Sequence, residues 1–199
     1  MESSDLIVDD FAARRLRQLR QDAGLTLDGL SQASGVSRAM ISRIERGEAS
    51  PTAVLLARLS TALGHSLSSF FAAGEGEKPV PLARRDTQHV WTDPETGYVR
   101  RAVSPPGTAS AVDLVEVHLP PARAVRFPPQ ASSEGIKQHV WVLEGTLTLE
   151  VAGERFALEA GDCLFHDIGR GHSFENESGK PVRYLVALEH GRRRGKGLE

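Results

Sequence analysis

The stretch "TLDGLSQASGVSRAMISRIERGEASP", from Thr26 to Pro51, decides the fold of the first part of the chain. Thr26 is a good N-cap, and the helix that it begins ends at Gly35. Ser37 begins a second helix, which ends at Gly47 and turns its apolar residues to one side. Two short helices joined through "SGVS" have the features of a helix-turn-helix.

Helical patterns continue on both sides of this pair. Upstream, "DDFAARRLRQLRQDAG" predicts a helix that ends at Gly24. Downstream, "SPTAVLLARLSTALG" predicts a helix with Ser50 as N-cap, Pro51 at the first helical position and Gly64 at its end. The run "SLSSFFA" predicts a last short helix. Five helices with short connections predict a compact all-α unit.

The second helix of the pair starts with small and polar side chains that suit a major groove. Arg38 and Arg43 can reach guanine edges, and the small Ala39 avoids a clash with the groove. Hydroxyls at helix starts, here those of Thr26 and Ser37, suit phosphate oxygens. Residues 11–64 hold eight arginines and four acidic residues, although the whole chain has a net charge of −2. This local positive charge favours double-stranded DNA as a partner.

Residues 9–71 resemble the lambda-repressor-like, xenobiotic-response-element type of DNA-binding domain, including its "S-x-I-E-R-G-x-x-x-P" signature. The resemblance implies that this region is a DNA-binding domain. The residues it places on base-contacting positions are Arg38, Ala39 and Arg43. Those it places on or near phosphate-contacting positions are Thr26, Ser37, Ser42 and Arg46.

The same resemblance implies a structural role for Arg20 and Glu45, as an internal ion pair between the first and third helices. Leu27 stands where many relatives carry a glutamine, so a glutamine clamp on the DNA backbone is not expected. The other arginines of the unit, Arg14, Arg15 and Arg58, are expected to lie on a solvated surface.

The hydrophobic period changes after residues 72–81, "AAGEGEKPVP", which have the composition of a linker. Short runs such as "VDLVEVHL" and "TLTLEV" alternate apolar and polar residues, and the even spacing predicts an antiparallel sandwich or barrel. The predicted division is a flexible acidic arm (1–8), the helical domain (9–71), a linker with a lead-in strand (72–99), the β domain (100–190) and a basic tail (191–199).

The stretch "GDCLFHDIGRGHSFEN", residues 161–176, resembles the second motif of the cupin barrels, with Asp167 in place of the usual proline. "QHVWVLEGTLTLEVAGE" resembles the end of the first motif, which implies an antiparallel β-barrel or jelly roll over residues 100–190. In metal-binding cupins the two motifs supply three histidines and a glutamate. Here only His172 matches, because Gln138 replaces the glutamate and residues 129–137 contain no histidine. We therefore expect no metal ion and no other cofactor.

Strand alternation suggests which side chains would line a cavity inside the β domain. If Gln138 points inward, His139 and Trp141 point outward, where they would pack on another sheet or a second protomer. Glu116 and His118 share one face of "VDLVEVHL", which could be internal. The expected effector pocket consists of Glu116, His118, Phe127, Gln138, Val140, Val142 and His172.

Three further expectations concern single residues of the β domain. A metal site rebuilt around His172 from Glu116, His118 or Glu134 stays open as a less favoured alternative. His166 and His172 are expected to be hydrogen-bonded pocket or structural histidines. Cys163, the only cysteine, is expected to be a small core residue.

The order of helix-turn-helix, linker and cupin resembles bacterial one-component transcription regulators. It implies a homodimer that binds an operator and a small organic effector, and that is not an enzyme. An interaction module without effector, such as an antitoxin, and a metal-dependent cupin enzyme remain as alternatives. The single cysteine, the polar N-terminus and the lack of a membrane-length apolar run predict a cytoplasmic protein with no membrane partner.

Overall fold

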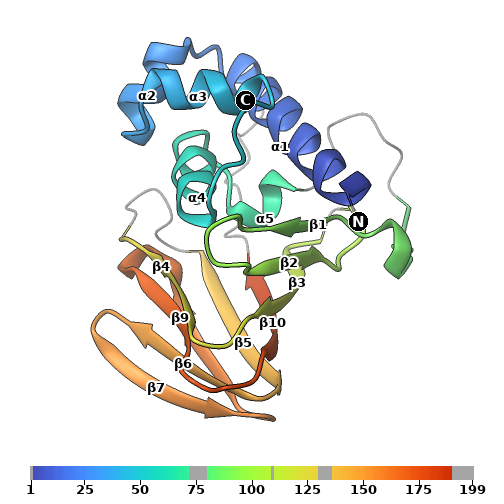
Figure 1. Cartoon of the computed structure of the whole chain (residues 1–199), viewed down its shortest axis with the longest axis vertical. Helices are drawn as coiled ribbons and strands as arrows, with labels where there is room; N and C mark the ends of the chain where they lie inside the picture. The colour runs from blue at the N-terminus through green and yellow to red at the C-terminus, as the bar shows by residue number, and fades with distance from the viewer. Residues whose placement is uncertain (1, 72–79, 109, 130–135, 190–199) are drawn as a thin grey trace, which may run out of the picture.

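The computed structural model describes residues 2–71, 80–108, 110–129 and 136–189. Its helices gather at one end of the molecule and its strands at the other, with α4 and α5 between α2–α3 and the sheets (Figure 1). Three parts of the sequence prediction lie outside the described residues: most of the linker (residues 72–79), the basic tail and Glu134. No helix among the described residues is long and apolar enough to cross a membrane.

The helical part contains four helices of eight residues or more and one single-turn helix within the described ranges. They are α1 (Glu2–Asp22), α2 (Leu27–Ser34), α3 (Arg38–Glu45), α4 (Ala53–Ala62) and the short α5 (Leu67–Phe70). Two predicted caps are confirmed: the Thr26 hydroxyl accepts the N–H of Gly29 (3.0 Å), and the Ser37 hydroxyl accepts that of Met40 (3.3 Å). Gly35 ends α2 in the left-handed conformation that glycine tolerates best (φ 65°).

Two helix starts differ from the prediction. The N-cap of α4 is Thr52, whose hydroxyl accepts the N–H of Leu55 (3.3 Å), so the assignment of Ser50 and Pro51 to these positions is wrong. Threonine caps nearly as well as serine, which makes the choice between them a matter of packing. The helix α1 begins at Glu2, so residues 2–8 continue α1 where a flexible arm was expected. No glycine or proline interrupts residues 2–22.

The apolar core of the helical part fixes the orientation of α3. Leu16, Leu30, Ile41, Leu56 and Leu59 are fully buried between the helices. Burying such a side chain contributes about 1.5–3 kcal/mol each. The apolar side of α3 is thus fixed inward, and its opposite side faces solvent.

Three arginines join the helices from the outside. Arg20 forms a bidentate pair with Glu45 (2.6 and 2.9 Å), which confirms the predicted ion pair. Arg58 donates to the backbone carbonyl of Ser34, at the end of α2, from both Nε (3.1 Å) and Nη2 (2.9 Å). Arg15 donates to the carbonyl of Phe70 (3.2 Å). The expectation that Arg15 and Arg58 are only solvated surface is therefore wrong, because both satisfy carbonyls at helix ends.

The β domain is a sandwich of two antiparallel sheets. Its strands are β1 (Val90–Thr92), β2 (Val99–Ala102), β3 (Val112–Leu119), β4 (Arg123–Phe127), β5 (Lys137–Glu144), β6 (Thr146–Val151), β7 (Glu154–Glu159), β8 (Cys163–Asp167), β9 (His172–Asn176) and β10 (Val182–Glu189). One sheet has the order β1-β2-β3-β10-β5-β8 and the other β4-β9-β6-β7. Within the described ranges no strand of one sheet pairs with a strand of the other, so the sandwich alternative holds and a closed barrel is not observed.

The predicted alternation of β5 is confirmed. Gln138, Val140 and Val142 point between the sheets and are buried, whereas the side chain of Trp141 is 46% exposed. Tyr184 of β10 and Phe174 of β9 fill the same interior, with ring centroids 5.2 Å apart. A two-residue period with one buried face fixes the register of these strands.

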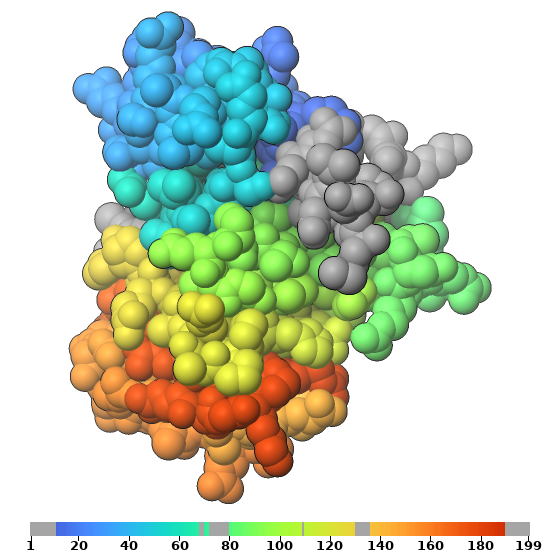
Figure 2. Space-filling view, in the orientation of Figure 1, coloured from blue at the N-terminus to red at the C-terminus, as the bar shows by residue number. Residues whose placement is uncertain are grey.

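The helical part packs directly on the sandwich (Figures 1 and 2). Aromatic rings form this contact: Phe71 lies 6.2 Å from Phe11 and 5.9 Å from Trp91, and Phe11 lies 4.5 Å from His89. Trp91 belongs to β1, which lies within residues 72–99. The six-stranded sheet therefore begins with a strand that anchors the helices.

Candidate functional site

The exposed side of α3 is the candidate nucleic-acid interface. Arg38, Ala39 and Arg43 are exposed, whereas Ile41 and Ile44 point into the helical core. The pair α2–α3 lies at the end of the molecule away from the sheets (Figure 1). Of the strands that the structure describes, none therefore lies between α3 and a DNA groove.

The caps that form α2 and α3 also prepare their N-termini for phosphate. The hydroxyls of Thr26 and Ser37 accept backbone N–H groups, and a hydroxyl used as acceptor can still donate its own proton. A phosphate oxygen near either helix start would receive that proton and the positive end of the helix dipole. Between them, Leu27, Arg38, Ala39 and Ser42 line a shallow hollow.

Three of the predicted contact residues, Arg38, Ser42 and Arg46, have partners within the protein. Arg46 pairs with Glu48 (2.6 Å) and donates to the hydroxyl of Ser42. The hydrogen bond from Arg46 lowers the pKa of the Glu48 carboxyl. Arg38 lies 3.4 Å from Asp28 in a solvent-exposed pair. To contact a phosphate, Arg46 would have to give up its pair with the carboxylate of Glu48. Arg38 would give up only its pair with Asp28, which is solvent-exposed and therefore weak.

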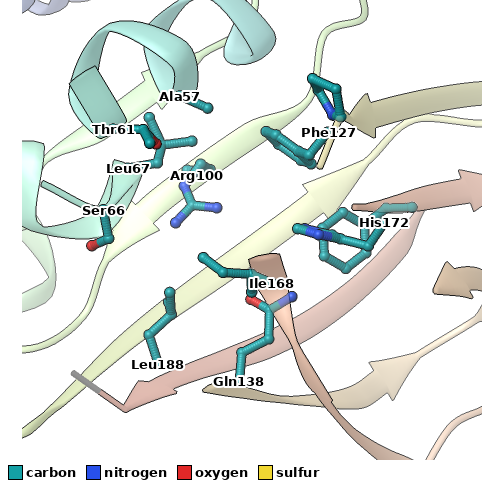
Figure 3. A pocket seen from close by; sticks show the side chains of 12 residues that line it. Ala57, Thr61, Ser66, Leu67, Arg100, Phe127, Gln138, Ile168, His172 and Leu188 are labelled. Atoms are coloured by element: carbon teal, nitrogen blue, oxygen red, sulfur yellow. The ribbon is translucent and has the colours of Figure 1, made fainter. Parts of the chain in front are cut away.

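A second candidate site is the cavity between the helical part and the sandwich. It has a volume of about 50 Å³. The helical side contributes Ala57 and Thr61 of α4, with Ser66 and Leu67 at α5. Figure 3 shows these residues on one side and Arg100, Ile168, Gln138 and His172 on the other. The helical part therefore forms one wall of the cavity.

The structure brings only part of the predicted pocket together. Phe127, Gln138 and His172 line the cavity. Val140 and Val142 are fully buried between the sheets and do not reach it.

Glu116 and His118 lie on the opposite, outer face of β3, so their placement in the pocket is wrong. The inward positions of β3 belong to Val115, Val117 and Leu119, each buried. A shift by one residue reverses the faces of a strand, and polar side chains on an alternating strand default to the outside. Glu116 instead pairs with Arg101 (3.2 Å) and Arg183 (3.1 Å).

Two histidines and an amide meet beside the cavity. The side-chain amide of Gln138 lies 2.6 Å from Nε2 of His166. The other ring nitrogen of His166, Nδ1, lies 3.2 Å from the carbonyl oxygen of Asp167. The consistent assignment has Gln138 donating to Nε2 and Nδ1 donating to the carbonyl. The ring of His172 packs against His166, with centroids 4.9 Å apart. No hydrogen bond reaches the buried Nδ1 of His172 from any described residue.

Burial keeps both rings neutral. It lowers the pKa of His166, and it lowers that of His172 to about 3, with His166 and Arg100 adding to the effect. In the part of the chain that the structure describes, no three His, Cys, Asp or Glu side chains are grouped to hold a metal ion. The chemistry that these residues offer is hydrogen bonding to a ligand.

Sequence reasoning missed Arg100, the charged residue of the cavity. Its side chain is 7% exposed, and Nη1 donates to the hydroxyl of Tyr98 (2.9 Å). In "YVRRAV" the two arginines are adjacent, and alternation alone would have favoured Val99 as the inward residue. The aromatic Tyr98 two residues before Arg100 was the available signal that this face is internal.

The outer face of the six-stranded sheet carries exposed aromatic residues. We use the term aromatic face for a surface on three neighbouring strands. It is formed by His139 and Trp141 of β5, Cys163 and Phe165 of β8 and Leu185 of β10. Phe165 is 54% exposed and its ring lies 4.9 Å from that of His139. Cys163 is exposed, so its prediction as a core residue is wrong. A sheet face of this composition is typical of protein–protein contacts.

The neutral state of His172 predicts a pH dependence of stability. Between its folded pKa of about 3 and the ordinary value near 6.5, the unfolded chain binds a proton that the folded protein does not. Stability is therefore lost as the pH falls from 7 to 5, by about 2 kcal/mol from this residue. Urea unfolding at both pH values should show this loss in the wild type and a smaller one in His172→Gln. Equal losses in the two proteins would show that His172 titrates normally.

Comparisons with known proteins agree with this two-part architecture. Residues 16–70 match the family model for the helix-turn-helix, and residues 115–188 match that for the cupin domain. The chain is 26% identical to the HTH-type transcriptional regulator SutR of Escherichia coli K12, over 92% of the chain and 96% of SutR. It is 29% identical to the HTH-type transcriptional regulator PuuR of the same organism, over 87% and 92%.

A solved structure shows the same fold over nearly the whole chain. The HTH_3 family transcriptional regulator from Vibrio cholerae superposes with a TM-score of 0.77 at 23% identity, covering 94% of this chain and 99% of that one. The fold of both parts, and their order along the chain, is thus shared with a known protein.

Proposed function

We propose that this chain, a transcriptional regulator that joins a helix-turn-helix DNA-binding domain to a cupin domain, acts as a homodimer on a two-fold symmetric operator and responds to a small effector. The observation that carries the proposal is that residues of α4 and α5 line the cavity beside the sandwich. The helices that support the DNA-reading helix also form one wall of the cupin cavity, so a ligand there would contact the DNA-binding part directly.

The reading surface supports the DNA-binding part of this function. Arg38, Ala39 and Arg43 lie exposed along α3, and the hydroxyls of Thr26 and Ser37 cap the two helix starts. This arrangement suits base contacts from α3 and phosphate contacts from the caps. SutR and PuuR, which align over most of their length with this chain, are named transcriptional regulators.

The aromatic face supports the dimer. One helix-turn-helix domain gives a small interface, and tight operator binding needs two of them related by symmetry. Trp141 and Phe165 are large, exposed and lie on the neighbouring strands β5 and β8, and aromatic residues of this kind dominate the energy of protein interfaces. A second copy that covers the same face gives a self-complementary contact with two-fold symmetry.

Coupling between effector and DNA follows from the position of α4 and α5. A ligand that fits the cavity stabilises the docked arrangement of the helical part, whereas a ligand that is too large favours its release. Either changes operator affinity only if the ligand binds one arrangement more tightly than the other. A tenfold change in operator affinity requires a difference of about 1.4 kcal/mol.

The experiment that tests the DNA-binding assignment is the variant Arg43→Ala. It should weaken specific operator binding by about 1–3 kcal/mol, because a bidentate contact to a base edge is lost. A footprint titration measures the change. Arg123→Ala, which removes an equal charge from an exposed position in the cupin, is the matched control and should bind as the wild type. Equal operator affinity of Arg43→Ala and wild type would show that α3 is not the reading helix.

A further inference from the structure

We propose that the cavity between α4–α5 and the sandwich binds a short-chain aliphatic monocarboxylate, with its carboxylate on Arg100 and its alkyl chain against Phe127, Phe174 and Leu188. This inference rests on the proposed function, because it names the chemical class of the effector of that site. It follows from the charge of the cavity, the hydrogen-bonding groups around it and its size.

The charge of the cavity is positive. Of the described residues that line it, Arg100 alone carries a full charge at neutral pH, and none is acidic. Arg100 comes from β2 and points into the cavity, toward the space between Leu67 and Ile168 (Figure 3). A buried guanidinium in an otherwise neutral wall favours an anion and disfavours an amine.

The guanidinium is held in one orientation before any ligand arrives. Its Nη1 donates to the hydroxyl of Tyr98 (2.9 Å), and Tyr98 is fully buried. A planar guanidinium binds a carboxylate through two parallel N–H donors, which makes a carboxylate a better match than a spherical anion. A fixed orientation lowers the entropy that binding would otherwise lose.

Neutral polar groups surround the same space. The ring of His172 faces the cavity, and among the described residues nothing hydrogen-bonds its buried Nδ1. In the tautomer that carries its proton on Nδ1, the neutral imidazole can donate this N–H to a carboxylate without adding charge. Gln138, whose amide is anchored on His166 (2.6 Å), presents a second neutral group.

The remainder of the cavity is apolar and small. Phe127 and Phe174 contact each other edge to face, with centroids 6.2 Å apart, and Leu188 and Ile168 lie nearby. A volume of about 50 Å³ holds about three to five water molecules. A ligand of similar size has a carboxylate and a chain of only a few carbons, such as propionate or butyrate, and leaves the helical part docked.

The test compares ligands of equal shape and different charge on the full-length wild-type protein. Butyrate, butyramide and butylammonium are titrated by calorimetry and by thermal unfolding, followed by the series from acetate to octanoate. Butyrate should bind at least tenfold more tightly than its amide, butylammonium should not bind, and affinity should fall for chains longer than the cavity. Inorganic phosphate is included as an anion without an alkyl chain and should bind less tightly than butyrate.

Two variants test whether the carboxylate binds to the guanidinium of Arg100. Arg100→Gln should lose at least tenfold in butyrate affinity, whereas Arg126→Gln, which removes a charge from a side chain of β4 that is 70% exposed, should keep it. Because the wild-type series does not depend on either variant, the inference stays testable if Arg100→Gln does not fold. Tighter binding of butyramide, butylammonium or phosphate than of butyrate, or no binding of any of them, would overturn the inference.

Operator binding is measured in parallel by fluorescence anisotropy. If the protein binds its operator as a dimer but no carboxylate, the ligand class is wrong and the regulator function stands. If it binds carboxylate but no operator, the cavity assignment stands and the proposed function fails. The two failures are therefore distinguishable.

Discussion

Replacing Trp141 with glutamate is expected to convert the protein into a monomer and to lower its operator affinity by about 100- to 10,000-fold. Trp141 lies in the middle of the aromatic face, opposite Cys163 on one side and Leu185 on the other. A carboxylate at this position would be buried without a partner in the dimer. Operator binding would then depend on one reading head, and the gain from linking two half-site contacts would be lost.

The fold should survive this change, because the side chain of Trp141 is 46% exposed and points away from the core. Sedimentation measures the oligomeric state, and anisotropy with a labelled operator measures the affinity. Ala157→Glu introduces the same charge at an exposed position of β7, on the other sheet, and should remain dimeric. A Trp141→Glu protein that stays dimeric and binds its operator normally would place the dimer contact elsewhere.

The second large effect is expected from Glu45→Ala, which should lower the free energy of unfolding of the helical domain by about 3 kcal/mol. Glu45 and Arg20 are 8% and 13% exposed, and their bidentate contact ties α3 to α1. Removing the carboxylate leaves the guanidinium of Arg20 largely buried without its partner. The position of α3, and with it the reading surface, depends on this contact.

Circular dichroism at a helical wavelength during urea unfolding measures the loss. Glu48→Ala is the matched control, since Glu48 pairs with Arg46 in an exposed contact of similar length (2.6 Å). Its unfolding midpoint should stay close to that of the wild type, because solvent weakens such pairs. Equal midpoints for Glu45→Ala and Glu48→Ala would mean that burial adds nothing to the Arg20–Glu45 contact.

The helical domain was predictable from sequence because its signals are local. A cap acts within three residues, so Thr26 and Ser37 could be assigned without knowing the fold. The pairing of Arg20 with Glu45 is not local, and it came from the resemblance alone. The start of α4 was misplaced because Ser50 and Thr52 are both competent caps, and packing decides between them.

The strands were harder to assign because alternation shows two faces without saying which is internal. For β5 the prediction assumed that Gln138, Val140 and Val142 point inward, and all three are buried. For β3 the polar pair Glu116 and His118 was assigned to the interior for its chemistry, although the valines between them occupy it. Burying the apolar side chains of β3 contributes more free energy than burying its polar ones, so the valines face inward and the polar pair faces outward.

The cavity itself could not be predicted from the sequence. Its walls come from α4, α5 and five different strands, and the docking of the two domains has no local signature. Leu67 and Arg100 are 33 positions apart and face each other only because Phe11, Phe71 and Trp91 hold the domains together. The aromatic character of these residues was visible, but their partners were not.

The most direct test of the account is selection of binding sites from a random DNA library with the full-length protein. A homodimer that reads DNA through α3 should enrich an inverted repeat, with half-site centres separated by about one helical turn, or 10 base pairs, or a multiple of it. Arg43→Ala should relax the preference at one symmetric pair of positions. A library that shows no enriched sequence, or an enriched sequence without two-fold symmetry, would contradict the account.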